Sequence, residues 1–150
     1  MRYIEALDAY AGPERSVFLA GGIVGCPDWQ QDLVLLLHNT DLVLLNPRRR
    51  HFPIDDPAAA PAQIAWEHRH LRTAAAISFW FPCESLCPIV LYELGAWSMT
   101  DKPIFVGTHP QYQRRQDVIE QTRLARPDVH VVSSLAALAD RIRLVLDPLV

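Results

Sequence analysis

Apolar residues along this chain gather in five short, nearly continuous runs, at residues 17–20, 42–45, 77–81, 104–107 and 129–132. Continuous apolar runs of this length, with β-branched and aromatic residues among them, are typical of strands that are buried on both faces of a sheet. The pattern therefore predicts five buried strands. Residues 1–15 carry little periodicity and are expected to form a short helix or a lead-in.

Segments with helical spacing separate these runs. They predict helices at about residues 28–38, 62–73, 88–97, 114–125 and 135–146. Asp28 and Ser134 stand where N-cap residues are expected, and Pro88 stands where a first helical turn accepts proline. The spacing predicts a set of inward-facing residues: Leu33, Leu36, Leu37, Ile64, Trp66, Leu71, Ile89, Val90, Leu91, Leu94, Trp97, Leu138, Ile142 and Val145.

Strands and helices thus alternate without a repeat or an internal linker, which indicates one domain over residues 1–150. Such alternation is typical of an α/β fold with a parallel sheet, right-handed crossovers and helices on both faces. Ligands of these folds bind beyond the carboxyl ends of the strands. We therefore expect one crevice, bordered by residues 21–28, 46–51, 82–87 and 107–112.

Composition narrows the function classes. The chain has 150 residues, of which 50% are apolar and 21% are charged, and its net charge is -3. This charge gives no general case for nucleic-acid binding. No apolar run approaches a membrane span, and the N-terminus has no signal-peptide pattern, so a cytoplasmic protein is expected. Three cysteines without a zinc spacing indicate neither disulfides nor a structural metal, and nothing indicates a cofactor.

Glu93 is the most unusual residue of the predicted helices. It lies between Tyr92 and Leu94 in a strongly apolar segment, with no basic residue within four positions. Burying a carboxylate there as an ion is costly. Two interpretations remain open: a half-exposed glutamate near a helix N-terminus, or a carboxylate with a function.

A basic run, Arg48-Arg49-Arg50-His51, directly follows the second predicted strand. Arginine side chains at the carboxyl end of a strand suit phosphate or another anionic group. The alternative is a solvated turn. The following residues, 52–61, read as a long loop that either lies over a site or is loosely held.

Several segments together resemble the nucleoside 2-deoxyribosyltransferases, and more closely their nucleoside 2-deoxyribosyltransferase-like branch. The matching segments are VFLAGGI followed by Asp28-Trp29, LLNPRR, QIAWE, ISFWFPCES, PIVLYELGAW and KPIFVGTHPQYQRRQDV. They cover roughly residues 17–119 in the order of the family. The resemblance implies a flavodoxin-like, doubly wound sheet of five strands in the order 2-1-3-4-5. It also implies a homo-oligomer that builds its sites partly at subunit contacts.

The resemblance also implies a role for Glu93. In the family, the glutamate of the Glu-Leu-Gly element attacks the anomeric carbon of a 2-deoxynucleoside and holds the sugar as a covalent ester. Further carboxylates assist, and Glu84 and Glu67 are the positions that we match to them. The structural alternatives are an exposed loop acid for Glu84 and a surface partner of a nearby arginine for Glu67.

The same resemblance indicates binding residues. Gly21 and Gly22 would line the sugar pocket, and Trp29 would stack on a base or simply belong to the core. Asn46 or Gln63 would bind the edge of the base. Tyr112 would either complete a neighbouring subunit's site or organise its own loop.

The leading hypothesis is therefore an enzyme that transfers 2-deoxyribose between a nucleoside and a free nucleobase without a cofactor. A rival is a hydrolase of nucleosides or of their 5′-monophosphates, for which Arg48 would supply a phosphate contact. A third hypothesis is a nucleotide-binding or sensing module without turnover.

Overall fold

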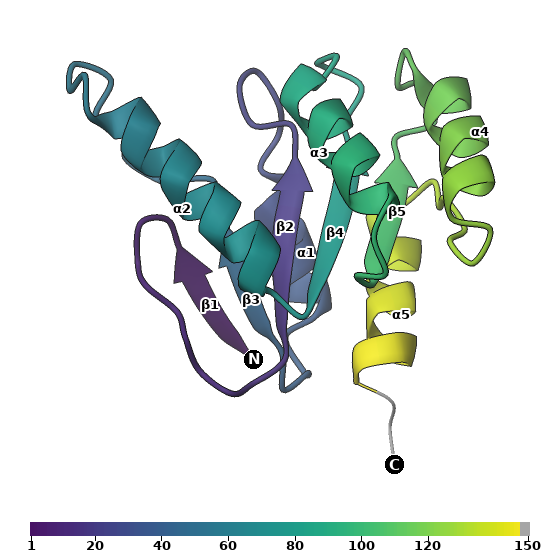
Figure 1. Cartoon of the computed structure of the whole chain (residues 1–150), viewed down its shortest axis with the longest axis horizontal. Helices are drawn as coiled ribbons and strands as arrows, with labels where there is room; N and C mark the ends of the chain where they lie inside the picture. Colours follow the sequence, from purple (N-terminus) through teal and green to yellow (C-terminus); the bar gives the residue numbers. More distant parts are fainter. Residues whose placement is uncertain (148–150) are drawn as a thin grey trace.

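The computed structural model describes residues 1–147, and these form an α/β fold around one parallel sheet (Figure 1). The strands are β1 (Arg2–Glu5), β2 (Ser16–Gly21), β3 (Val43–Asn46), β4 (Ala76–Phe81) and β5 (Ile104–Thr108). They lie in the order β1-β3-β2-β4-β5, and every neighbouring pair is parallel. The predicted fold class is confirmed.

Helices cover both faces of this sheet. They are α1 (Trp29–Leu36), α2 (Ala59–Thr73), α3 (Pro88–Ser98), α4 (Arg115–Ala125) and α5 (Leu135–Leu146). One core cluster joins the sheet to α2, α3 and α4, and a second joins it to α1 and α5. Figure 1 shows α2 and α3 in front of the strands and α1 behind them.

The predicted helix starts are confirmed by their caps. The Asp28 side chain accepts a hydrogen bond from the Gln31 backbone, and the Ser134 hydroxyl accepts one from the Ala137 backbone. Pro88 is the first residue of α3. Helix α2 begins at Ala59, three residues before the prediction, within the stretch that the sequence indicated as loop.

The predicted fifth strand at residues 129–132 is wrong. Only Val132 is bridged to β5, at Gly107, because the chain leading to it is held elsewhere. Arg126 binds Asp128 at 2.7 Å and donates to the carbonyl oxygens of Thr100 and Lys102, which holds this connection beside the turn before β5.

The fifth strand is β1, from the segment expected to be a lead-in. It pairs with β3 in the register Arg2↔Val43 to Glu5↔Asn46, at the opposite edge. Four half-exposed residues with two charges give no apolar run, so the pattern could not predict this edge strand. The other four strands keep the expected order.

Some residues expected to face inward are on the surface. Trp66, Leu71, Val90 and Leu94 are buried as predicted, but Ile64 and Ile89 are 64% and 65% exposed, and Val145 is also exposed. For Ile64 on α2 and Ile89 on α3 the reason is a groove between these helices, which both side chains line. None of the helices within residues 1–147 combines the length and the apolar character that a membrane crossing requires.

Candidate active site

Two cavities meet beside the carboxyl end of β2. The smaller one, here called the inner cavity, has a volume of about 280 Å³. It is lined by the end of β2 and its loop, by the first turn of α3 and by Pro47, Glu67 and Glu93. The larger one, here called the α2–α3 groove, has a volume of about 650 Å³ and runs between these two helices. Glu67, Ile89 and Glu93 line both, so the two carboxyl groups stand at the junction.

The environment of Glu93 makes its carboxyl group hard to ionise. Burial, with a smaller contribution from the charge of Glu67, raises the pKa of Glu93 to about 7. Burial also raises the pKa of Glu67, against a hydrogen bond from Gln63 that lowers it. Glu93 is therefore not a solvated surface acid. Two half-buried carboxyl groups that repel one another at the mouth of a cavity are a common mark of acid–base or nucleophilic sites.

Gln63 holds Glu67 in place. Its side-chain nitrogen donates to Glu67 Oε1 and to the backbone oxygen of Pro47, both at 2.7 Å. These bonds connect α2 to the segment after β3. Glu67 thus has a defined position at the junction and does not pair with Arg69 or Arg72 on its own helix, as the surface alternative required.

Gly21 and Gly22, which the resemblance assigned to a sugar pocket, form one wall of the inner cavity. A side chain at Gly21 would overlap the Trp29 ring and reach within 2.5 Å of the Trp80 carbonyl oxygen. At Gly22 it would come within 2.7 Å of the Cys87 sulfur. The close packing behind this wall requires glycine at both positions.

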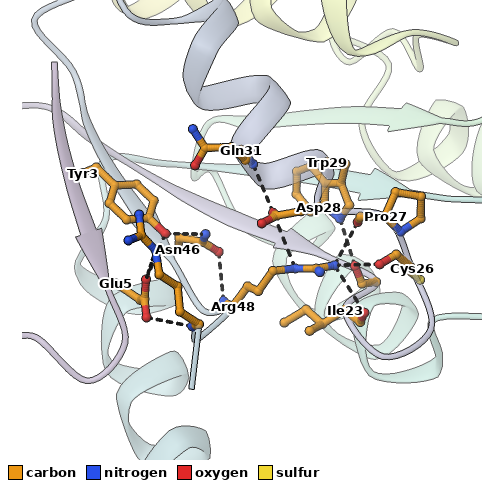
Figure 2. A network of polar contacts seen from close by, with 12 residues as sticks. Tyr3, Glu5, Ile23, Cys26, Pro27, Asp28, Trp29, Gln31, Asn46 and Arg48 are labelled. Atoms are coloured by element: carbon orange, nitrogen blue, oxygen red, sulfur yellow. Dashed lines mark hydrogen bonds and ion pairs between the residues drawn. The ribbon is translucent and has the colours of Figure 1, made fainter. Parts of the chain in front are cut away.

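Trp29 and Asn46 are occupied by structural contacts. Trp29 is the first residue of α1 and is buried in the core, and its indole nitrogen donates to the Gly22 carbonyl at 2.9 Å. Asn46 is buried as well; it donates to the Tyr3 hydroxyl and accepts from the Arg48 backbone (Figure 2). Neither residue lines either cavity, so the structure does not bring them to the site.

Arg48 stabilises the loop that follows Gly21 and Gly22. Its guanidinium donates to the carbonyl oxygens of Ile23, Cys26 and Pro27 at 2.9 to 3.2 Å and lies 3.6 Å from the Asp28 carboxylate (Figure 2). The side chain is only 18% exposed. It is thus neither a free anion contact nor part of a solvated turn.

Glu84 and Tyr112 also lie outside both cavities. Glu84 is exposed on the loop after β4. Tyr112 is buried against Phe81 and donates to the Leu86 carbonyl at 2.7 Å, and burial raises its pKa to about 12. This geometry matches the second of its two interpretations, organisation of the loop. Residues 107–112, expected to border the crevice, do not line it.

Of the residues that line the α2–α3 groove, sequence reasoning named Gln63, Glu67 and Glu93 as site residues but not the others. Its apolar lining includes Tyr92, which is 78% exposed, and its polar lining includes His68 and Arg72. Helical spacing alone marks such apolar residues as core. Cys87 lies in the predicted border, residues 82–87, but was not named as a site residue. It is the N-cap residue that precedes α3, has a φ of +52° and lines the inner cavity.

The three cysteines are free, and burial raises the pKa of Cys87 to about 11, so this thiol is protonated near neutral pH. Within residues 1–147, no group of three or more histidine, cysteine, aspartate or glutamate side chains is arranged to hold a metal ion.

Comparison with known proteins identifies a family for this chain. Among curated proteins, none matches the chain significantly. The sequence model of one family, described as nucleoside 2-deoxyribosyltransferase like, matches residues 14–112. That range includes β2 to β5, the glycine wall and both carboxyl groups of the junction. The chain therefore belongs to the nucleoside 2-deoxyribosyltransferase like family.

Proposed function

We propose that this protein cleaves the N-glycosidic bond of 2-deoxynucleosides and transfers the sugar to a second nucleobase, with Glu93 as nucleophile. The observation that carries the proposal is the junction itself. Glu67 and Glu93 face the same two cavities, and burial raises the pKa of both. Family membership supplies the class of substrate, and the two carboxyl groups supply the chemistry.

In the first step, a carboxylate oxygen of Glu93 forms a bond to C1′ of the sugar while the bond from C1′ to the base breaks. The electron pair of that bond goes to the base nitrogen, which takes a proton from the Glu67 carboxylic acid. The transition state resembles an oxocarbenium ion, which a nearby carboxylate stabilises and then traps.

In the second step, a ring nitrogen of another base attacks C1′ and the ester bond to Glu93 breaks. The incoming base loses its proton to the Glu67 carboxylate, so both groups return to their starting state. Water in place of the base would give free deoxyribose, which is the hydrolase alternative. The same site supports both outcomes, and the occupancy of the base position decides between them.

This chemistry needs one proton on the carboxyl pair. With Glu67 charged, Glu93 keeps its proton up to a pKa of about 7. Below that pH, and until the second carboxyl group is also protonated, the pair holds one proton, which belongs to the two coupled groups together. The reactive arrangement places the charge on Glu93 and the proton on Glu67. Gln63 favours the charged form of Glu67 while the site is empty, and it limits the population of this arrangement.

The 5′-monophosphate version of the hydrolase loses its main support. Arg48 is bonded to three carbonyl oxygens and Asp28, and among the described residues that line the inner cavity there is neither lysine nor arginine. Two carboxyl groups face the same space. A phosphate dianion would meet repulsion there and no compensating cation.

The test is a base-exchange assay. The protein is incubated with thymidine or deoxyadenosine and a different free base, and nucleosides, bases and sugar are separated by chromatography. We expect the exchanged nucleoside, and mass spectrometry of the quenched protein should find one deoxyribosyl group on the peptide that contains Glu93. Free sugar alone would indicate hydrolysis. Intact substrate with saturable binding would indicate a module without turnover and contradict the proposal.

A further inference from the structure

We propose that the α2–α3 groove is the subsite for the nucleobase, and that the space beside Ala96 and the ring of Tyr92 determine which bases are accepted. The inference rests on the proposed function, because it assigns the two cavities to the two halves of a nucleoside. It replaces the base contacts expected from Trp29 and Asn46, both of which the structure uses elsewhere.

Continuity of the two cavities is the first argument. The inner cavity and the groove have Glu67, Ile89 and Glu93 in common, so a molecule that occupies both must pass the two carboxyl groups. In a nucleoside, the bond that is broken lies between sugar and base. The smaller cavity, walled by backbone of the glycine loop, suits the sugar, and the groove then receives the base.

The lining of the groove is the second argument. Apolar side chains dominate it, with Ile64 and Leu71 from α2 and Tyr92 and Trp97 from α3. A flat heterocycle gains most from such surfaces, especially from aromatic rings. His68 and Arg72 lie in the same lining and offer hydrogen bonds for the edge of a base. The volume of about 650 Å³ leaves room for a bicyclic purine.

The third argument is that this surface has no partner within the described chain. Ile64, Ile89 and Tyr92 are each more than 60% exposed although they point into one groove. A second copy of the chain is the other occupant to consider. We favour the base because the catalytic carboxyl groups form part of the same wall, so that a protein surface filling the groove would block one half of the reaction site.

The experiment tests the groove by placing a larger side chain in it. Ala96 lines it, whereas its neighbour Gly95 lines a separate cavity between α3 and α4 and has open space around it. Ala96→Phe therefore places a ring in the groove, and Gly95→Phe places the same ring on the other side of the same helix. Binding of adenine and of thymine is measured by calorimetry for both variants, for the unmodified protein and for Glu93→Gln, together with base exchange and the molar mass in solution.

We expect Ala96→Phe to weaken base binding by about tenfold or more, with the larger loss for adenine, because filling a snug apolar site discriminates by size. Gly95→Phe should bind both bases normally, and Glu93→Gln should bind them without turnover. If Ala96→Phe does not fold, Tyr92→Ala serves instead: this side chain is mostly exposed, and its loss should weaken binding several-fold with the fold intact.

Other results would contradict either the base subsite or the proposed function, and the measurements distinguish the two. Base exchange with unchanged base binding in Ala96→Phe would leave the proposed function standing and remove the groove from it. An altered molar mass with unchanged base binding would identify the groove as an interface between copies. Base binding that depends on Ala96 without any turnover would instead support the subsite and contradict the proposed function.

Discussion

The apolar helices on the two faces of the sheet pack differently. Helices α1 and α5 contact one another behind the sheet, and Leu33, Leu37, Leu138 and Ile142 are completely buried there. Arg143 of α5 also donates a hydrogen bond to the Leu36 carbonyl at the end of α1. On the other face, α2 and α3 leave a groove between them, and Ile64 and Ile89 remain exposed. Apolar spacing therefore builds core only where a helix meets the sheet or another helix.

Acidic side chains differ between the two faces in the opposite sense: they are exposed on the α1–α5 face and half-buried on the α2–α3 face. The acidic residues Asp32 on α1 and Asp140 on α5 are exposed. On the groove side, Glu67 and Glu93 are half-buried and have raised pKa values. The α2–α3 groove thus combines solvent-exposed apolar side chains with half-buried carboxyl groups. Both features lower the stability of the fold, and we therefore associate this face of the sheet with function.

The largest expected effect comes from removing the nucleophile. Glu93→Gln should lower base exchange by at least about 10³-fold, because an amide cannot form the glycosyl ester. Initial rates by chromatography check this. Asp32→Asn, on the closed face, is the matched control and should keep normal rates. Equal rates in Glu93→Gln and the unmodified protein would exclude Glu93 as nucleophile.

Truncation of buried and exposed aliphatic residues tests the comparison directly. Leu33→Ala should reduce the free energy of unfolding by about 3 kcal/mol, since it leaves a cavity in the closed core. Ile64→Ala should cost less than about 1 kcal/mol, since this side chain is mostly solvated. Urea denaturation measures both. A similar cost at the two positions would mean that the groove is covered in solution.

Glu67→Gln should lower the exchange rate by about 10²-fold, with the largest loss for bases that are poor leaving groups, because general acid catalysis is removed. In the unmodified protein, kcat/KM should fall at low pH, where the pair takes up a second proton and no carboxylate remains to attack. It should also fall above about pH 7, where the pair loses its last proton.

In Glu67→Gln the decline above pH 7 should disappear, because no acid remains to be deprotonated. The low-pH limb should move to higher pH, since Glu93 must then lose its own proton to react, whereas in the unmodified protein either carboxyl group of the pair can lose the first one. A pH profile of kcat/KM measures both changes. Persistence of the high-pH decline would show that another group donates the proton.

Arg48→Ala should have the smallest effect of this series. It removes the guanidinium that holds the glycine loop, so we expect about 2 kcal/mol less stability and a higher KM with kcat nearly unchanged. Thermal unfolding and steady-state kinetics check this. Arg50→Ala removes only an exposed ion pair with Glu5 and should change little. A selective loss of activity on a 5′-monophosphate would revive the phosphate role.

Much of the fold was predictable because its signals are local. The four buried runs became β2 to β5 in the predicted order, and Asp28 and Ser134 cap their helices as expected. Strand β1 was missed because an edge strand needs no apolar run. Residues 129–132 were predicted as a strand because their pattern fits one, but only Val132 is bridged to β5, and Arg126 ties the preceding connection to the turn before that strand.

The candidate site was predictable only in part. Glu93 could be singled out from the sequence because an unpaired acid in an apolar helix is locally anomalous, and the structure places its carboxyl group at the junction of the two cavities. The contacts of Arg48 and Trp29 could not be foreseen, because each binds backbone oxygens on a segment brought near only by folding.

The sequence by itself determined the parallel α/β class, the helix starts and the exceptional character of Glu93, because periodicity, capping and local charge act between residues close in the chain. Only the tertiary structure decided that Glu67 joins Glu93, that Arg48 is occupied, and that Ile64 and Ile89 line a groove. The physical reason is that burial and partnership depend on contacts between distant segments, and apolar spacing does not specify which surface a helix will meet.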